Sequence, residues 1–208
     1  MKAGVYNMDC MDAMRQFPDG YFDLAVVDPP YGIGVNHSMG RRKGDKPSGY
    51  KPAVWDSKPP DRDYFNELFR VSKNQVIWGG NYMTDFLYPS PCWLIWDKMQ
   101  EFSGAVFEMA WSSFQSPAKA FRLSRVQAYV GQDKVHPTQK PVKLYEWIYM
   151  NYLPRGGKVL DTHLGSGSNR IAADKMGNIE FYGYEIDKDY FDASVKRFEQ
   201  YKSQLTMF

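Results

Sequence analysis

An apolar run that stops at two prolines constrains the fold of this chain more than any other feature. Residues 22–27 predict a buried β-strand, and Asp28-Pro29-Pro30-Tyr31 follows it directly. Because proline lacks an N–H and has a fixed φ, the strand must end there. Asp28 is therefore expected at the carboxyl end of the strand, where open α/β sheets bind ligands. A carboxylate, a free carbonyl and an aromatic ring suit a planar, amine-bearing base, although an ordinary strand end with a half-buried tyrosine is the alternative.

A second segment predicts a binding turn for a cofactor. Residues 158–161 predict a short strand, and the turn Gly165-Ser166-Gly167 leads into a predicted helix over 169–176. Glycines let the backbone approach a ligand closely, and a helix N-terminus favours anionic groups. The next predicted strand, 180–185, ends at Glu185, a place that suits a ribose hydroxyl. This order indicates an adenosine-bearing cofactor, but not NAD, because the spacing G-x-G-x-x-G is absent.

Three motifs resemble one enzyme family. Asp28–Tyr31, the segment His136-Pro137-Thr138-Gln139-Lys140-Pro141 and the turn at 164–167 are similar to motifs of the S-adenosylmethionine-dependent DNA amino-methyltransferases. These enzymes modify adenine N6 or cytosine N4. Residues 6–14 and 17–19 resemble the family's opening segment, and the catalytic motif precedes the cofactor turn, which is the circularly permuted β-class order. The chain departs from the family at Thr162-His163, commonly Pro-Phe, and at Ser168, commonly Thr.

Alternating strands and helices predict a doubly wound, largely parallel α/β sheet, and the resemblance implies a Rossmann-like methyltransferase sheet in permuted order. Besides the segments above, strands are expected over 5–8, 75–78, 93–96 and 106–111. Helices are expected over 10–17, after Asp61, after Pro141 and from 188 to about 204. The permuted order places the first strand beside the strand that ends at Glu185. It also places the strand that ends at Asp161 beside the strand that ends at Val27.

The resemblance also implies roles for individual residues. Asp28, Pro29, Pro30 and Tyr31 are the expected catalytic residues. Asp9 and Cys10 are expected at the adenine of the cofactor, although Asp9 also fits a helix N-cap. Thr138, Gln139 and Lys140 are expected near the methionine moiety, whereas His136 is interpreted as a loop residue. His163 is expected either at the cofactor or buried beneath the turn. The full predicted cofactor set is Asp9, Cys10, Asp28, Thr138, Gln139, Lys140, Asp161, Thr162, His163, Gly165, Ser166, Gly167, Ser168, Asn169, Glu185 and Ile186.

Composition favours one cytoplasmic enzyme domain over residues 1–208. The hydrophobic share is 43%, but no run reaches the ~18 apolar residues of a membrane span. Two cysteines imply no disulfide framework, which favours a reducing cytoplasm. The scattered histidines and cysteines lack metal-ligand spacing, so no metal is expected. A net charge of +2 permits DNA binding without requiring it.

Two segments are candidate DNA-recognition elements. Residues 32–60 form a long, basic loop directly after the catalytic motif, and Arg41, Arg42, Lys43 and Lys46 are predicted to contact phosphates; a solvated surface loop is the alternative. Residues 113–135 are predicted to leave the sheet and carry a second basic group. The chain leaves few residues for a target-recognition region. The recognised DNA sequence is therefore expected to be short or loosely defined, or its recognition to be shared with a second subunit in a homodimer.

The sequence therefore predicts a site-specific methyltransferase for the N6 of a flipped adenine in DNA. Asp28 and the Pro29 carbonyl would accept hydrogen bonds from the amine, and Tyr31 would stack on the base. Cytosine N4, an RNA base and a protein glutamine amide are alternative targets. A nonenzymatic DNA-binding module is a further alternative.

Overall fold

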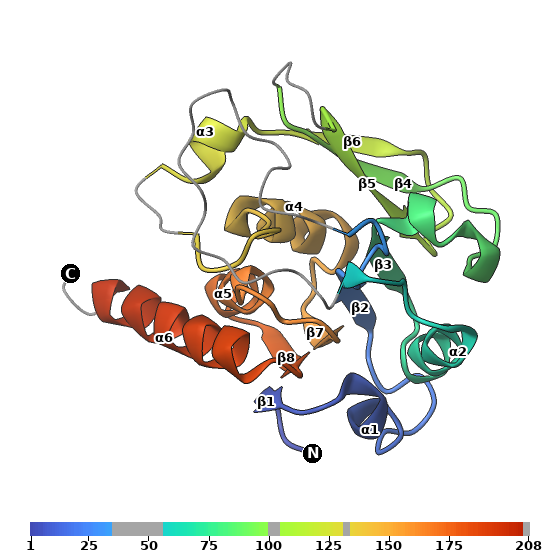
Figure 1. Ribbon diagram of the computed structural model, residues 1–208, viewed down its shortest axis with the longest axis horizontal. Helices are drawn as coiled ribbons and strands as arrows, with labels where there is room; N and C mark the ends of the chain where they lie inside the picture. The colour runs from blue at the N-terminus through green and yellow to red at the C-terminus, as the bar shows by residue number, and fades with distance from the viewer. Residues whose placement is uncertain (35–55, 100–104, 131–133, 206–208) are drawn as a thin grey trace.

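An eight-stranded sheet forms the centre of the computed structural model, which describes residues 1–34, 56–99, 105–130 and 134–205 (Figure 1). The strands follow the order β1-β8-β7-β2-β3-β5-β4-β6 across the sheet. Neighbouring strands are parallel, except that β5 is antiparallel to both β3 and β4. The strands are β1 (Gly4–Asn7), β2 (Leu24–Val27), β3 (Gln75–Trp78), β4 (Trp93–Asp97), β5 (Phe107–Ser112), β6 (Lys119–Arg122), β7 (Gly157–Asp161) and β8 (Ile179–Glu185).

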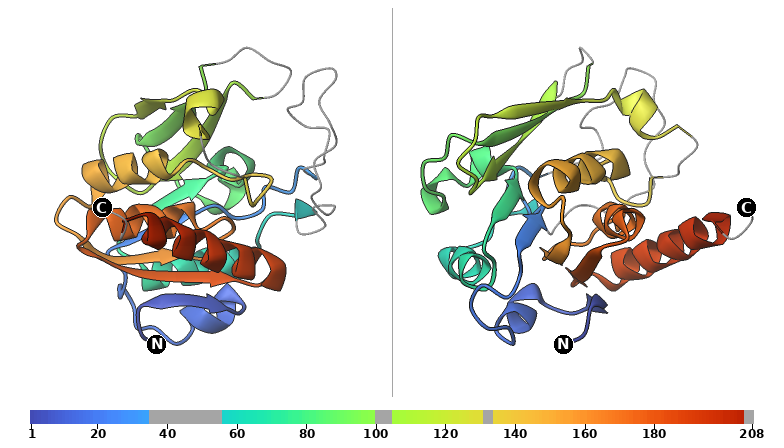
Figure 2. Two further views of the ribbon diagram at one scale, coloured as in Figure 1. Left: turned by 90° about the vertical axis from the view of Figure 1, so that its left-hand side faces the viewer. Right: turned by 180° about the vertical axis from the view of Figure 1, so that it is seen from behind.

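Helices cover both faces of the sheet (Figures 1 and 2). On one face lie α1 (Cys10–Met14) and α2 (Arg62–Val71); on the other lie α4 (Val142–Tyr152), α5 (Ser168–Met176) and α6 (Lys188–Leu205). Short turns of helix form η2 (Gly80–Tyr82), η3 (Thr84–Phe86) and α3 (Arg125–Ala128). Strand β2 shows why two layers are needed, because Leu24 and Val26 pack in one apolar core and Ala25 and Val27 in the other. The predicted α/β fold class is confirmed.

The permuted strand order is also present. Val5 of β1 is paired with Gly183 of β8, and Leu24 of β2 is paired with Val159 of β7. Because β2 and β7 are adjacent and parallel, the catalytic motif after β2 and the glycine turn after β7 reach the same edge of the sheet. This edge is where ligands bind in open α/β folds.

Two predictions need correction. Helix α1 ends at Met14 rather than at residue 17, because the N–H groups of Gln16 and Phe17 turn more tightly onto the carbonyls of Ala13 and Met14. Part of the predicted excursion 113–135 is an edge strand, since β6 pairs in parallel with β4 and Phe121 packs on Trp147 of α4. Strand β6 has only four residues, Lys119, Ala120, Phe121 and Arg122, which do not alternate between apolar and polar side chains and so carry no strand signal.

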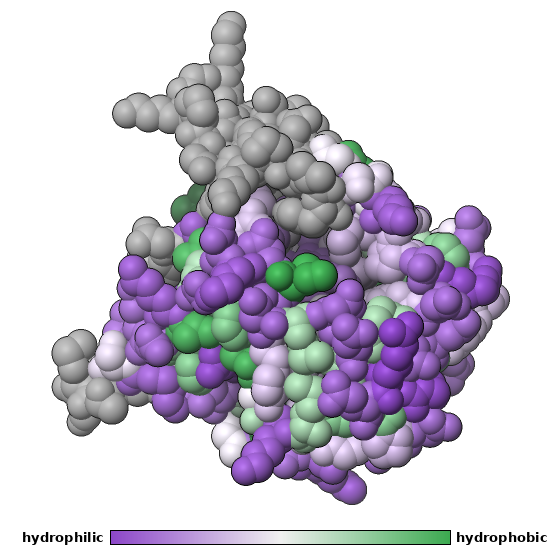
Figure 3. Space-filling model, turned by 60° about the horizontal axis from the view of Figure 1, so that its bottom comes forward, coloured by the Kyte–Doolittle hydropathy of each residue, from purple (hydrophilic) through white to green (hydrophobic). Residues whose placement is uncertain are grey.

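The predicted phosphate contacts Arg41, Arg42, Lys43 and Lys46 lie outside the described residues, so their role stays a prediction. Within the described ranges, no helix combines the length and apolarity needed to cross a membrane. The face in Figure 3 is mainly hydrophilic, and its apolar side chains gather in separate patches. Such patches are common on protein surfaces and do not by themselves define a docking face.

Candidate active site

A cavity of about 1050 Å³ lies at the carboxyl ends of the central strands. Asp28 reaches it from the end of β2, Gly165 from the turn after β7, and Glu185 from the end of β8. The segment before α4 supplies a further wall. The predicted site residues that line this cavity are Asp28, Pro29, Pro30, Tyr31, Thr138, Gln139, Lys140, His163, Gly165, Ser166, Ser168, Glu185 and Ile186.

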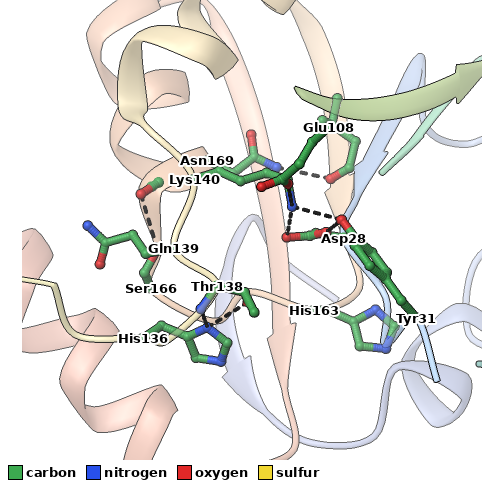
Figure 4. A network of polar contacts seen from close by, with 12 residues as sticks. Asp28, Tyr31, Glu108, His136, Thr138, Gln139, Lys140, His163, Ser166 and Asn169 are labelled. Carbon is green, nitrogen blue, oxygen red and sulfur yellow. Dashed lines mark hydrogen bonds and ion pairs between the residues drawn. The ribbon is translucent and has the colours of Figure 1, made fainter. Parts of the chain in front are cut away.

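Lys140 contacts two residues of the segment Asp28–Tyr31. Its ammonium forms an ion pair with Oδ2 of Asp28 and donates to the Tyr31 hydroxyl at 3.0 Å (Figure 4). The Tyr31 hydroxyl in turn donates to Oδ1 of Asp28 at 2.7 Å. The place of Lys140 near the methionine moiety stays a prediction, and in the structure its ammonium closes a polar triangle with Asp28 and Tyr31.

Two further charged residues of this wall were not found by sequence reasoning. Glu108 of β5 has its Oε2 3.3 Å from the Lys140 ammonium, and its Oε1 accepts from Lys98 at 2.8 Å. Both residues line the cavity. The sequence offered one signal for Glu108, a lone acid inside the otherwise apolar strand 106–111. A charged residue in such a strand is rarely buried without a partner.

Burial and ion pairing shift the pKa values of Asp28 and Glu108 in opposite directions. Burial raises the pKa of Asp28 above its ordinary value, against the opposing charge of Lys140. Burial also acts to raise the pKa of Glu108, but Lys140 and Lys98 outweigh it and lower that pKa to about 2. The pKa of Lys140 is raised, because Asp28 and Glu108 outweigh the effect of burial. Glu108 is thus a fixed anion, whereas Asp28 holds a proton more readily than an ordinary aspartate.

The Tyr31 ring is held from several sides. The main-chain N–H groups of Tyr31 and Gly32 donate to Oδ1 of Asp56, at 2.7 and 3.0 Å. Asp56 is 1% exposed, and no sequence motif pointed to it. The Tyr82 ring stacks on Tyr31 with 5.4 Å between centroids and an interplanar angle of 19°. These contacts fix an aromatic ring at the mouth of the cavity beside Asp28.

The glycine turn is anchored by the acid at the end of β8. Gly165 and Gly167 have φ values of 50° and 71°, which other residues adopt only with strain. Glu185 accepts from the N–H of Gly165 through Oε2 and from the N–H of Asp187 through Oε1, both at 2.9 Å. Each carboxylate oxygen can accept more than one hydrogen bond, so Glu185 can hold the turn and still accept from a ligand hydroxyl.

Four of the predicted cofactor residues support the turn rather than line the cavity. The Asn169 amide donates to the Val26 carbonyl at 3.0 Å and to Asp161 at 2.9 Å, while its oxygen accepts from Tyr149. Burial raises the pKa of Asp161 to about 7. The hydroxyls of Thr162 and Tyr64 form a hydrogen bond of 2.7 Å. All four of these residues are buried: Asn169, Asp161, Thr162 and Gly167. Asn169 links α5 to β2 through its hydrogen bond to Val26.

Asp9 and Cys10 also stand outside the cavity lining. The Asp9 carboxylate caps α1 by accepting from Met11 at 2.7 Å, which is the helix-cap alternative. Burial raises the pKa of the Cys10 thiol to about 12, so this thiol is a poor nucleophile. His136, interpreted from sequence as a loop residue, lines the cavity and packs against Tyr190 with 4.3 Å between ring centroids.

One buried donor beside the cavity lacks a partner within the described part of the chain. Gln139 is 4% exposed, and its Oε1 accepts from the Val135 N–H at 3.0 Å. Its Nε2 has no hydrogen-bond partner among the described residues. A buried unpaired donor is costly, so this amide is a source of local instability in the segment before α4. Within the same ranges, no group of His, Cys, Asp and Glu is placed to hold a metal ion.

Solved structures show the same fold. The M1.HpyAVI–SAM complex aligns with a TM-score of 0.62 and 16% identity, over 93% of this chain and 98% of that one. The PvuII DNA methyltransferase, which is cytosine-N4-specific, aligns with a TM-score of 0.64 and 15% identity, over 95% of this chain and 86% of that one.

Sequence comparison identifies the family. YubD of Escherichia coli (strain K12), named as a provisional methylase, is 26% identical over 221 residues, which span 91% of this chain and 87% of YubD. The family model N6_N4_Mtase, described as DNA methylase, matches residues 70–196. That match covers more than half of the chain and includes Glu108, Lys140, the glycine turn and Glu185. The chain therefore belongs to the N6_N4_Mtase family of DNA methylases.

Proposed function

We propose that this protein transfers the methyl group of S-adenosylmethionine to the exocyclic N6 of a flipped adenine in DNA. S-adenosylmethionine is the methyl donor of this family. One observation carries the proposal: the catalytic motif and the glycine turn with Glu185 open into one cavity. A donor held at the turn and a base held at Asp28 would therefore face each other.

The chemistry needs an acceptor beside the target amine. The lone pair of an exocyclic amine is delocalised into the ring, which makes the nitrogen a poor nucleophile. Hydrogen bonds from the amine to Asp28 and to the Pro29 carbonyl would localise that lone pair and stabilise the developing positive charge. The S–CH3 bond breaks as the N–CH3 bond forms, and the amine then loses a proton. The cavity wall holds two carboxylates, Asp28 and Glu108. Asp28 is the better proton acceptor, because its pKa is raised whereas that of Glu108 is lowered.

The size of the cavity lies at the upper end of the range for ligand pockets, and its wall offers groups for both cofactor and base. A drug-sized ligand commonly fills a pocket of about 300–1,000 Å³. The cavity here reaches about 1050 Å³, and its wall carries both the aromatic ring of Tyr31 and the turn at Gly165. The target atom lies inside a base pair in duplex DNA, so the base must leave the stack to reach Asp28.

Cytosine N4 is the second candidate target. The amines of adenine and cytosine are both exocyclic and both adjoin a ring nitrogen, so the same acceptors serve either base. The PvuII enzyme, with its similar fold, is cytosine-N4-specific. Adenine is preferred here because an aspartate in the first position of the catalytic motif resembles the adenine enzymes.

Nucleoside analysis tests the proposal. The protein would be incubated with methyl-labelled S-adenosylmethionine and DNA of mixed sequence, and the DNA would be digested and separated by mass spectrometry. We expect labelled N6-methyladenine, and none with Asp28→Ala. Labelled N4-methylcytosine would establish the second candidate. Label in RNA or on a protein glutamine, but not in DNA, would contradict both, and cofactor binding without transfer to any of them would indicate a nonenzymatic module.

A further inference from the structure

Four charged residues form a continuous row in the cavity wall, which we call the charge row: Asp28, Lys140, Glu108 and Lys98. They come from four places in the fold, namely the end of β2, the segment before α4, strand β5 and the end of β4. Signs alternate along the row, so each cation lies between or beside carboxylates. Figure 4 shows the Lys140 ammonium directed at Asp28, with Glu108 close by.

The observed pairing of Lys140 makes Asp28 a weaker acceptor for the target amine. Both oxygens of Asp28 are engaged, Oδ1 by the Tyr31 hydroxyl and Oδ2 by Lys140. A cation in contact with Asp28 competes for the lone pairs that the target amine needs. It also repels the positive charge that develops on the amine during transfer. A looser contact between Lys140 and Asp28 would therefore favour the reaction.

Glu108 offers Lys140 a second partner within a short displacement. Its Oε2 is already 3.3 Å from the ammonium, and its other oxygen is taken by Lys98. The side chain of Lys140 is only 2% exposed, so its charge cannot move into water. The rings of Tyr31 and Trp78 flank the ammonium at 5.5 and 5.3 Å. Within the described residues, Asp28 and Glu108 are the carboxylates that form ion pairs with Lys140.

We propose that Lys140 is a positioning residue whose ammonium passes from Asp28 to Glu108 when the target base enters, so that Glu108 controls the availability of Asp28. This inference rests on the proposed function and adds two residues to it. Lys98 keeps Glu108 ionised in the buried wall, which maintains an anion ready for Lys140.

Charges around Asp28 give the proposal a distinctive pH signature. The groups that influence or face Asp28 are Lys140, Glu108, Tyr31, Asp161, Tyr145 and Tyr64. In Lys140→Met, the carboxylates of Asp28 and Glu108 face each other without a cation between them, so Asp28 should ionise at higher pH. In Glu108→Gln, Lys140 stays on Asp28, which should then ionise at lower pH.

The test is a double-mutant cycle on the single-turnover rate of methyl transfer, with saturating cofactor and DNA. The variants are Glu108→Gln, Lys140→Met and the combination of both. Glu146→Gln is the matched control, because Glu146 has a similarly buried side chain (23% exposed, against 24% for Glu108), pairs with Lys175 and does not line the cavity. Thermal melting and cofactor titration of every variant show whether the fold and the donor site are intact.

We expect Glu108→Gln to lower the rate about ten- to hundredfold, because Lys140 remains on Asp28. Adding Lys140→Met should restore most of that loss, since no cation is left to occupy Asp28. The acidic limb of the rate profile should move to lower pH in Glu108→Gln and upward by about one pH unit in Lys140→Met. Glu146→Gln should match the wild type.

The outcomes separate this inference from the proposed function. A wild-type protein that methylates no DNA would contradict the proposed function and this inference with it. An active wild type in which the double variant loses the sum of the two single losses would contradict the inference alone. If the acidic limbs of the rate–pH profiles of Glu108→Gln and Lys140→Met coincide with that of the wild type, the inference is contradicted as well. If Glu108→Gln does not fold, Glu108→Asp replaces it, and the inference then requires a smaller rate loss that Lys140→Met again restores.

Discussion

Gly79 lies directly against the ring of Tyr31, and a Cβ at Gly79 would be 2.2 Å from Cε1 of that ring. Gly79 also has a φ of 68°, in the left-handed region. A glycine at the end of β3 therefore fixes where the aromatic face beside Asp28 can lie. The Tyr31 ring has little freedom to move, because Asp56 holds its main chain and Tyr82 stacks on it.

Gly79→Ala should displace the Tyr31 ring and lower methyl transfer strongly. Gly177→Ala is the matched control, because Gly177 has a similar φ of 73° and nothing within 4 Å of its would-be Cβ. Both variants should lose about 1–2 kcal/mol of stability from the left-handed conformation, and Gly79→Ala should lose more, because its Cβ meets the Tyr31 ring. Urea unfolding measures the two losses, and transfer assays should find a defect in Gly79→Ala alone. Equal activity in the two variants would show that the position of the ring does not matter.

Asp28→Ala should abolish methyl transfer while the affinity for the cofactor changes little. The carboxylate polarises the target amine, whereas the donor is expected at the glycine turn. Calorimetric titration with S-adenosylmethionine and a transfer assay on the same preparation give both quantities. Asp85→Ala, at an exposed site in η3, controls for loss of an aspartate. A variant that lost cofactor binding but kept activity would reverse the assignment.

Glu185→Ala should weaken cofactor binding roughly ten- to hundredfold, because a hydrogen bond to a charged group contributes about 1.5–3 kcal/mol. Part of the loss is expected through the turn, since Glu185 also accepts from the N–H of Gly165. Glu180→Ala, at an exposed position of the same strand, is the control. Unchanged affinity in a folded Glu185→Ala protein would place the ribose partner elsewhere.

His163 should make the fold sensitive to acid. Burial lowers its pKa from 6.5 to about 4, so the folded state binds fewer protons than the unfolded chain between these values. Its contribution to stability is therefore complete above about pH 6.5 and is lost as the pH falls toward 4. His136 acts in the same direction, and Asp161, with its pKa raised to about 7, acts in the opposite one. Denaturation of His163→Phe across this range isolates the His163 part, because the stability difference from wild type should change with pH. A constant difference would contradict the lowered pKa.

Two strand pairings, β1 with β8 and β2 with β7, could be predicted from the permuted motif order of the resemblance, and strong local signals marked the motifs themselves. Two prolines ended β2, and glycines separated β7 from α5. Strand β6 escaped prediction because its four residues gain their stability from β4 and from Trp147, which are remote in sequence. Helix α1 ended early for a similar reason, as the local pattern continued but the hydrogen bonds tightened.

The part of the site that sequence reasoning missed consists of charged residues. Glu108, Lys98 and Asp56 belong to no motif, and their importance follows only from the side chains that the fold places beside them. Lys140 was found by its motif, and its place near the methionine moiety stays a prediction. Its contact with Asp28 was missed, since a motif names residues without fixing the direction of a long side chain. The cofactor contacts of Asp161 and Asn169 also stay predictions, and the structure adds that Asn169 joins β2 to β7 through Val26 and Asp161.

The pairing of β1 with β8 and of β2 with β7 has a consequence for biosynthesis. Gly4 finds its partner at Tyr182, and Leu24 finds its partner at Val159, so β1 and β2 emerge from the ribosome long before β8 and β7, although β3 can pair with the other edge of β2 much earlier. Contacts of such high sequence separation form slowly, and unpaired apolar strand edges aggregate. A growing chain must therefore protect one edge of Leu24–Val27 until β7 has been made. Termination before β7 should release a chain that has Asp28–Tyr31 but lacks the glycine turn, and its unpaired strand edges should recruit chaperones.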